Sequence, residues 1–353
     1  MVNEKQVLDA LSHVLDPELG KDLVSLNMIK DIKIENGIVH FTLLLTTPAC
    51  PLRNQIESSA KNAVFAVPEV KDVSIKIDAP VRAHQTRPET LTLPIQHIIA
   101  VGSGKGGVGK STISANIAIA LAQSGAKVGL LDADIYGPNI PKMMGISELP
   151  KQSGQKLIPA EAFGIKVMST GFLVKNDQPL IWRGPLLHSI IRQFFEDVQW
   201  EELDYLVVDL PPGTGDVQLS LSQLVSISGG VIVTTPQDVS LEDAGRALVM
   251  YQKLNIPILG VIENMGCLVL PNGEKMEIFG SGGGKKLADS NCVAFLGSID
   301  LDPKIRVGGD NGRPILITDE TSQPAQEIRK IAGEIAAKLS LQTLGMTEKG
   351  ATA

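Results

Sequence analysis

The sequence has little cysteine and no long apolar run. Its three cysteines, Cys50, Cys267 and Cys292, give no disulfide framework, which favours a reducing compartment. No apolar run approaches the roughly 20 residues that a membrane-spanning helix needs. The first residues also lack the apolar centre of a signal peptide. We therefore expect a cytoplasmic protein.

An excess of positive charge is also absent. The 353 residues carry a formal net charge of −7, so nonspecific binding to nucleic acid or to an anionic membrane is not favoured, and we expect neither as a partner. Hydrophobic residues make up 43% of the chain and charged residues 20%, which is typical of a soluble protein with a packed core. The length exceeds that of most single domains and suits two.

The pattern along the chain predicts two domains of unequal size. Helical and alternating periodicities predict a small α/β domain at residues 1–80, with a hairpin turn at Asn36-Gly37. Residues 81–95 contain several prolines and lack periodicity, so we interpret them as a linker. Apolar strands and amphipathic helices then follow over 96–343, and residues 344–353 are expected to form a flexible tail.

The larger domain opens with a glycine-rich loop that fits the phosphate-loop pattern Gly-x-x-x-x-Gly-Lys-Ser/Thr at every position. A short apolar run at His97–Val101 predicts a buried strand before the loop, and helical spacing predicts a helix over Ser111–Gln123 after it. The alternative is a glycine-rich turn that binds nothing. The residues assigned to nucleotide binding are Gly104, Lys105, Gly106, Gly107, Val108, Gly109, Lys110, Ser111 and Thr112.

Physical chemistry assigns roles within this loop. Glycines let the backbone turn its N–H groups toward a phosphate, and the following helix directs its positive end at the same anion. Lys110 is expected to neutralise oxygens of the β- and γ-phosphates, and Ser111 to hold Mg²⁺. The loop therefore predicts binding of a nucleoside triphosphate with Mg²⁺.

A second lysine, Lys105, follows the first glycine directly. With this residue the loop resembles that of the deviant P-loop ATPases, which include septum-site, partition, nitrogenase iron-protein and cluster-carrier families. The resemblance implies that Lys105 reaches across a homodimer to the partner subunit's nucleotide, so that ATP lies between the two subunits. It also implies that Lys105 and Lys110 are catalytic.

Carboxylates follow two predicted strands. The run Val128–Leu131 is followed by Asp132 and Asp134, and a second apolar run ends in Asp209 as in the Walker-B pattern. Ligands bind beyond the carboxyl ends of strands in open parallel sheets, and Asp209 is assigned to Mg²⁺ through water. The resemblance implies that Asp132 belongs to the Mg²⁺ shell and that Asp134 is catalytic, because it positions the attacking water. The alternative is an acidic turn.

Two further residues are assigned by resemblance alone. Gly213 lies in Pro211–Asp216, which resembles the second switch of these ATPases, where it would sense the γ-phosphate. Asn264 follows the predicted strand Ile258–Ile262 and would contact adenine. The alternative for Asn264 is a buried, hydrogen-bonded asparagine in a hairpin.

The combination of these motifs is similar to the Mrp/ApbC branch, the iron–sulfur cluster carriers, over nearly the whole chain. This resemblance implies a doubly wound, mostly parallel α/β P-loop sheet preceded by a small α/β domain. It implies a slow, partner-dependent ATP hydrolase that acts as a homodimer. The cargo would be an iron–sulfur cluster, taken as [4Fe–4S], and the partners would be apo iron–sulfur proteins and cluster scaffold proteins.

The first domain contains the turn Thr46–Pro51, which resembles the signature of a small domain family tied to iron–sulfur cluster assembly. Cys50 would lie at a helix N-terminus, where the helix dipole favours the thiolate, and would serve as a cluster ligand. The alternative is a small buried apolar side chain, which free cysteine often is.

The chain departs from the family at the expected cluster site. A Cys-x-x-Cys pair usually follows Asn-Met, but here Cys267 stands alone. Cluster iron usually takes four thiolates, and one cysteine per subunit at a two-fold axis supplies two. Cys50, a small molecule or a client would have to supply the others. Cys292 precedes an apolar run and is expected in the core.

Two rival functions remain open. A positioning ATPase of the partition or septum type would need a basic DNA-binding face or a basic amphipathic tail, and the net charge argues against both. A scaffold that binds assembly partners without its own cluster is compatible with the absent Cys-x-x-Cys pair.

Overall fold

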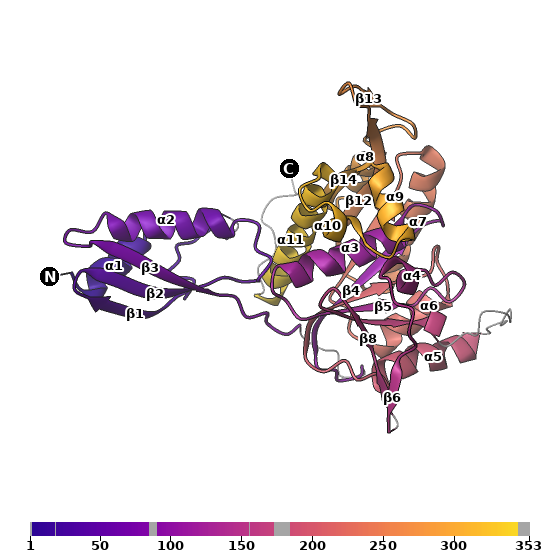
Figure 1. The fold of residues 1–353 in the computed structure, drawn as a ribbon, viewed down its shortest axis with the longest axis horizontal. Coiled ribbons are helices and arrows are strands. Elements are labelled where there is room, and N and C mark those ends of the chain that lie inside the picture. Colours follow the sequence, from indigo (N-terminus) through magenta and orange to yellow (C-terminus); the bar gives the residue numbers. More distant parts are fainter. Residues whose placement is uncertain (1, 18, 85–89, 155, 173–183, 345–353) are drawn as a thin grey trace. The chain divides into compact units, whose positions relative to one another are not determined.

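Figure 1 shows the computed structural model, which describes residues 2–17, 19–84, 90–154, 156–172 and 184–344. The chain divides into two compact units, residues 1–81 and 82–353, and each has its own sheet and apolar core. Apart from Val81, the described residues of the predicted linker belong to the larger unit, in which the Leu91 N–H donates to the Leu224 carbonyl. None of the helices in the described part of the chain has the length and apolar character of a membrane span.

The small unit is a three-stranded sheet with two helices. Its elements are α1 (Glu4–Leu11), β1 (Ile29–Glu35), β2 (Ile38–Leu44), α2 (Arg53–Phe65) and β3 (Asp72–Asp78). β1 and β2 are antiparallel, whereas β2 and β3 are parallel. Asn36 and Gly37 have φ values of 53° and 86°, as the predicted hairpin turn between β1 and β2 requires. α2 buries Ile56, Ala60 and Val64, which lie one helical turn apart and face the core.

The larger unit is built on a sheet of nine strands in the order β13-β12-β11-β4-β10-β5-β9-β8, with β14 also paired to β12. The contacts of β8 and β13 are antiparallel, and the other pairs are parallel. This arrangement confirms the predicted doubly wound, mostly parallel sheet. The elements are β4 (Ile95–Ser103), α3 (Lys110–Gln123), β5 (Val128–Asp132), α4 (Ile140–Met143), β6 (Lys151–Ser153), β7 (Lys156–Ile158), β8 (Ala160–Ala162), β9 (Ile165–Ser169), α5 (Gly184–Glu196), β10 (Leu203–Asp209), α6 (Asp216–Leu224), β11 (Gly229–Thr234), α7 (Asp238–Lys253), β12 (Ile258–Val269), β13 (Lys275–Met276), α8 (Gly283–Ser290), β14 (Phe295–Leu301), α9 (Pro303–Asp310), α10 (Ile315–Thr318) and α11 (Gln323–Thr343).

Helices cover both faces of this sheet, as Figure 1 shows. Alternate residues of β4 point to opposite faces, and Ile98 and Ala100 join the core under α5, α6 and α7. α3 and α11 pack against each other on the other face. Since β10 and β11 flank β4, the sheet extends in opposite directions from it, and the space beyond its carboxyl end is open to a ligand.

Two sequence-based interpretations are wrong in this unit. The strand predicted over Ile258–Ile262 is longer than expected: β12 continues to Val269, because a bulge with Met265 at a φ of 56° lets it resume and pair with β13. Cys267 therefore lies within a strand. Cys292 is exposed and has a φ of 53°, in the turn after α8, because the strand that follows begins only at Phe295.

Candidate nucleotide site

The loop after β4 has a backbone that only glycine permits. Gly109 has a φ of 83°, and a Cβ added there would lie 2.2 Å from the Asn264 amide nitrogen. A Cβ at Gly104 would lie 2.0 Å from the backbone of Asp243 in α7. The loop is thus held between α7 and the middle of β12, so its glycines serve packing as well as the predicted phosphate binding.

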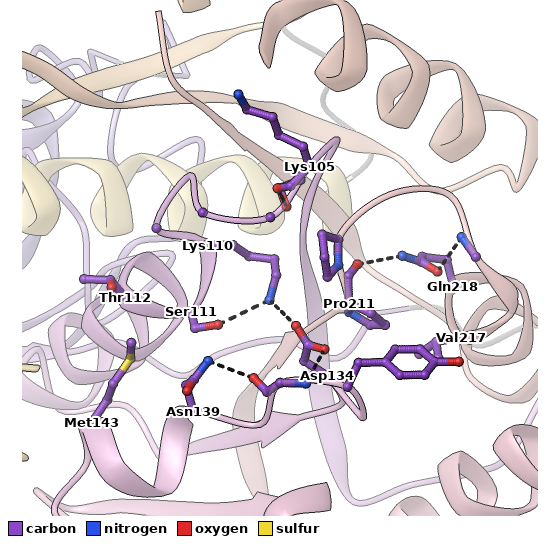
Figure 2. Close-up of a pocket in the computed structure, with 18 of the residues that line it drawn as sticks. Lys105, Lys110, Ser111, Thr112, Asp134, Asn139, Met143, Pro211, Val217 and Gln218 are labelled. Atoms are coloured by element: carbon purple, nitrogen blue, oxygen red, sulfur yellow. Dashed lines mark hydrogen bonds and ion pairs between the residues drawn. The ribbon is translucent and has the colours of Figure 1, made fainter. Parts of the chain in front are cut away.

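A cavity of about 740 Å³ opens beside this loop. The phosphate loop, the acidic turn after β5 and the start of α6 line it (Figure 2). A second cavity of about 270 Å³ adjoins the first, and Gly109, Thr112 and Met265 line both. Both cavities lie at the N-terminus of α3, so one could receive the phosphates of a nucleotide and the other its base.

Lys110 is the cationic centre of the site. Its Nζ lies 2.8 Å from Asp209 Oδ2 at the end of β10 and 3.6 Å from Asp134 Oδ2 in the turn after β5, so two carboxylates converge on one ammonium. Figure 2 shows the contact with Asp134. Asp209 is fully buried at the end of β10 and accepts hydrogen bonds from Ser111 Oγ at 2.6 Å and Ser114 Oγ at 2.7 Å. The predicted Lys110, Ser111, Asp134 and Asp209 are therefore brought together.

The acidic turn after β5 places its two carboxylates differently. Asp134 lines the larger cavity, and burial raises its pKa, while Lys110 opposes the rise and Asp209 adds to it. Asp132 is fully buried and does not belong to the described cavity lining. Burial, and after it the charge of Asp209, raises the pKa of Asp132 to about 8.

The hydrogen bonds of Asp132 hold the turn itself. Its carboxylate accepts from the backbone N–H of Asp134 and Ile140 and from Ser169 Oγ on β9. Its predicted place in a Mg²⁺ shell remains a prediction. Ser111 and Asp209, together with Asp134 at the cavity wall, form a set of hard oxygen donors, so the residues present fit Mg²⁺.

Lys105 points away from Lys110, toward the start of α7 (Figure 2). Its Nζ donates to Gln237 Oε1 at 3.3 Å, and its carbonyl accepts from Ser103 Oγ at 2.9 Å. Gly213, with a φ of 86°, donates its N–H to the Ser103 carbonyl at 2.8 Å. Lys105, predicted to reach the nucleotide of a partner subunit, and Gly213, predicted to sense the γ-phosphate, are therefore linked through Ser103.

Asn264 is buried at the wall of the smaller cavity. Its Nδ2 donates to the Val108 carbonyl of the phosphate loop at 2.9 Å. This contact joins β12 to the loop. Asn264 is thus buried and hydrogen-bonded, as the alternative proposed from the sequence expects, but it lies in a strand and not in a hairpin turn. The predicted contact with adenine remains a prediction.

The three cysteines do not form a metal site in the part of the chain that the structure describes. Across those residues no group of three or more His, Cys, Asp or Glu side chains is placed to hold a metal ion. Cys267 is half-buried, and its N–H donates to Asp300 Oδ1 at 3.2 Å. Cys50 is buried in the core of the small unit, as a small apolar residue would be.

Two contributors to the site were not identified from the sequence. Ser114 lies four residues after Lys110, one helical turn on, and this spacing could have indicated that it faces Asp209. Gln218 lies three residues after Gly215, at the position from which a side chain returns to cap the start of a helix. Both spacings are common in helices, so neither identifies a site residue unless the neighbouring strand or loop is also known.

Parallel strands whose carboxyl ends carry a phosphate loop and its lysine-bound aspartate define a P-loop nucleoside triphosphatase. Comparison with known proteins assigns the family. The family described as NUBPL iron-transfer P-loop NTPase matches residues 94–336, and the family described as iron-sulfur cluster assembly protein matches residues 4–77. The chain belongs to the iron-transfer P-loop NTPases, with an assembly-type domain at its start, as the resemblance predicted.

Individual relatives with similar sequences match most of this chain. An iron-sulfur cluster carrier protein of Synechocystis sp. is 49% identical over 98% of this chain and 100% of its own length. The chloroplastic Fe-S cluster assembly factor HCF101 of Arabidopsis thaliana is 40% identical over 93% of this chain and 63% of its own length. A nucleotide-binding protein from Archaeoglobus fulgidus, solved in complex with ADP, is 40% identical with a TM-score of 0.56, over 62% of this chain and 88% of its own.

Proposed function

We propose that this protein binds and hydrolyses ATP with Mg²⁺ and carries an iron–sulfur cluster to apo-proteins. The observation that supports nucleotide chemistry is the buried Lys110 between Asp209 and Asp134 at the phosphate loop. The family membership and the names of the relatives support the cargo. We further propose that it acts in the cytoplasm as a homodimer and that its partners are apo iron–sulfur proteins and cluster scaffold proteins.

The proposed roles follow from charge and position. Lys110 neutralises the β- and γ-phosphates, and Mg²⁺ takes the hydroxyl of Ser111 and, through water, the carboxylate of Asp209. Asp134, whose pKa is raised, lines the cavity and orients the attacking water. The Lys105 side chain can turn from Gln237 toward the nucleotide of a second copy, because its Nζ is held at Gln237 by one hydrogen bond of 3.3 Å.

The smaller cavity is proposed to hold the base, and Asn264 is proposed to favour adenine over guanine there. The Val108 carbonyl requires a donor, so it fixes Nδ2 of Asn264 on the loop side. What Asn264 can then offer to a base is its acceptor, Oδ1. An acceptor pairs with the 6-amino group of adenine and repels the 6-oxygen of guanine, so we propose ATP over GTP.

The cluster is proposed to lie between two copies of the chain. Cys267 is half-buried near the end of β12, and one thiolate from each copy supplies two ligands of a [4Fe–4S] cluster. The remaining ligands come from Cys50, a small molecule or the client. Burial of Cys50 in the small-unit core makes it the weaker candidate.

Anaerobic reconstitution with iron and sulfide tests this assignment. Wild-type protein is expected to develop visible charge-transfer absorbance that is largely lost in Cys267→Ser. Cys292→Ser is the matched control, because Cys292 is an exposed thiol of the same unit and should keep the absorbance. Loss in Cys50→Ser would make the small unit a ligand donor. If Cys267→Ser assembled as much cluster as wild type, Cys267 would not be the site.

One observation favours a second candidate function, that of a scaffold without its own cluster. Among the described residues no three His, Cys, Asp or Glu side chains are placed to hold a metal ion, and Cys267 stands alone at the position where the family usually has a Cys-x-x-Cys pair. A scaffold that recruits assembly partners without its own cluster fits that observation. Wild-type protein that hydrolyses ATP but takes up no cluster under the conditions above would favour it.

A further inference from the structure

Gln218 lies in the first turn of α6, directly behind the loop that carries Gly213. Its side chain is 1% exposed. Both polar hydrogens of its amide are used: Nε2 donates to the Pro211 carbonyl at 2.9 Å and to the Gly213 carbonyl at 3.0 Å. Oε1 accepts from the Gly215 N–H at 3.1 Å. One side chain therefore holds three backbone positions of the five-residue loop 211–215. Figure 2 shows its contact with Pro211.

We propose that Gln218 is the positioning residue that holds this loop for the γ-phosphate, a role that rests on the proposed hydrolysis of ATP. Gly213 has a φ of 86°, which favours glycine, and it is half-buried. Its N–H donates to the Ser103 carbonyl at 2.8 Å, and its carbonyl accepts from Gln218. Gln218 thus holds one side of Gly213 while the N–H on the other side can change partner.

The chemistry of this arrangement requires an amide. Two carbonyls, those of Pro211 and Gly213, converge on one nitrogen, and only a group with two N–H donors satisfies both. The Oε1 contact with Gly215 is separate, because it caps the N-terminus of α6 and a carboxylate would serve equally well there. Capping and loop positioning can therefore be separated by substitution.

Gln218→Glu is the variant that separates them. It keeps the shape and the cap on Gly215, but it removes both donors and places an anionic oxygen against two carbonyls. Without the two hydrogen bonds from Gln218 Nε2 the loop should open more readily, and opening breaks the bond from the Gly213 N–H to the Ser103 carbonyl. Hydrogen exchange at the Gly213 amide is therefore expected to rise by about tenfold or more, since tenfold corresponds to a loss of about 1.4 kcal/mol. The kcat for ATP is expected to fall at least tenfold, while ADP affinity stays within about twofold.

The matched control is Gln123→Glu. Gln123 lies at the end of α3 and donates its Nε2 to the Leu316 carbonyl at 3.2 Å, so this substitution also sets a carboxylate against a backbone carbonyl, but away from the cavity. The control accounts for any loss of stability, and only Gln218→Glu should change the preference for an ATP analogue over ADP. The ratio of kcat between Gln218→Glu and wild type should also rise as the pH falls, because a protonated carboxyl regains one donor.

The outcomes separate the two proposals. A wild-type protein that binds nucleotide but does not hydrolyse ATP would refute the proposed function, and hydrogen exchange at Gly213 would still test Gln218. If Gln218→Glu left that exchange and the ATP-to-ADP preference unchanged, Gln218 would be a helix cap only. Should Gln218→Glu fail to fold, Gln218→Met removes the same donors without a buried charge and is judged by the same exchange measurement.

Discussion

Replacing Lys110 with methionine tests whether the buried ammonium serves the fold as well as the phosphates. Lys110 is 6% exposed and Asp209 is fully buried, and their charged atoms lie 2.8 Å apart. Removing one partner of a buried ion pair costs about 3–5 kcal/mol, because the other charge is left without compensation. Lys110→Met should therefore lower the free energy of unfolding at pH 7 by about 3 kcal/mol, a large share of the roughly 5–15 kcal/mol of a typical domain.

The same substitution should weaken ATP binding by about a hundredfold, since the phosphates lose their main charge partner. The double variant Lys110→Met with Asp209→Asn removes the uncompensated charge, so it should recover much of the stability and none of the ATP affinity. Denaturant unfolding and calorimetric titration with ATP measure the two effects.

The control is Lys127→Met. Lys127 makes an exposed pair with Glu202 at 3.6 Å, and such pairs contribute at most about 1 kcal/mol. If Lys110→Met unfolded like the control, the ion pair would contribute nothing net to the fold. If it bound ATP like wild type, the site would be assigned wrongly.

Three further predictions concern single side chains. Lys105→Ala should reduce ATP hydrolysis by tenfold or more and leave ATP binding within about threefold, because its proposed target lies on a second copy; normal turnover would contradict the dimer. Asp134→Asn should retain ATP without turnover and accumulate dimers, and monomer alone in sedimentation at saturating ATP would count against its role. His97 is buried, and burial and then the charge of His84 lower its pKa to about 4, below the ordinary 6.5. Neutral, buried His97 therefore makes its full contribution to the free energy of unfolding above pH 6.5, and about 3 kcal/mol of that free energy should be lost as the pH falls to 4. Denaturant titrations should show no such loss in His97→Phe, which keeps the stacking on Tyr205.

The sequence by itself determined the features that are local in the chain. The Asn36-Gly37 turn follows from two residues that tolerate a positive φ, and the phosphate loop follows from a fixed spacing of glycine, lysine and serine. Apolar strands and amphipathic helices predicted an α/β domain, and the family resemblance carried by its motifs implied the doubly wound sheet. Lys110, Ser111 and Asp209 could be assigned together because parallel strands end at the same edge of a sheet.

Tertiary structure decided everything that depends on which segments meet. The bulge at Met265 carries β12 past its predicted end, and no local pattern marks it, since the same residues also suit a strand end. The exposure of Cys292 depends on where α8 stops and β14 starts. Gln218 gains its role because a loop folds back over the first turn of α6 and presents two carbonyls to one amide. Such contacts join backbone groups that carry no side-chain signature, so only the folded chain reveals them.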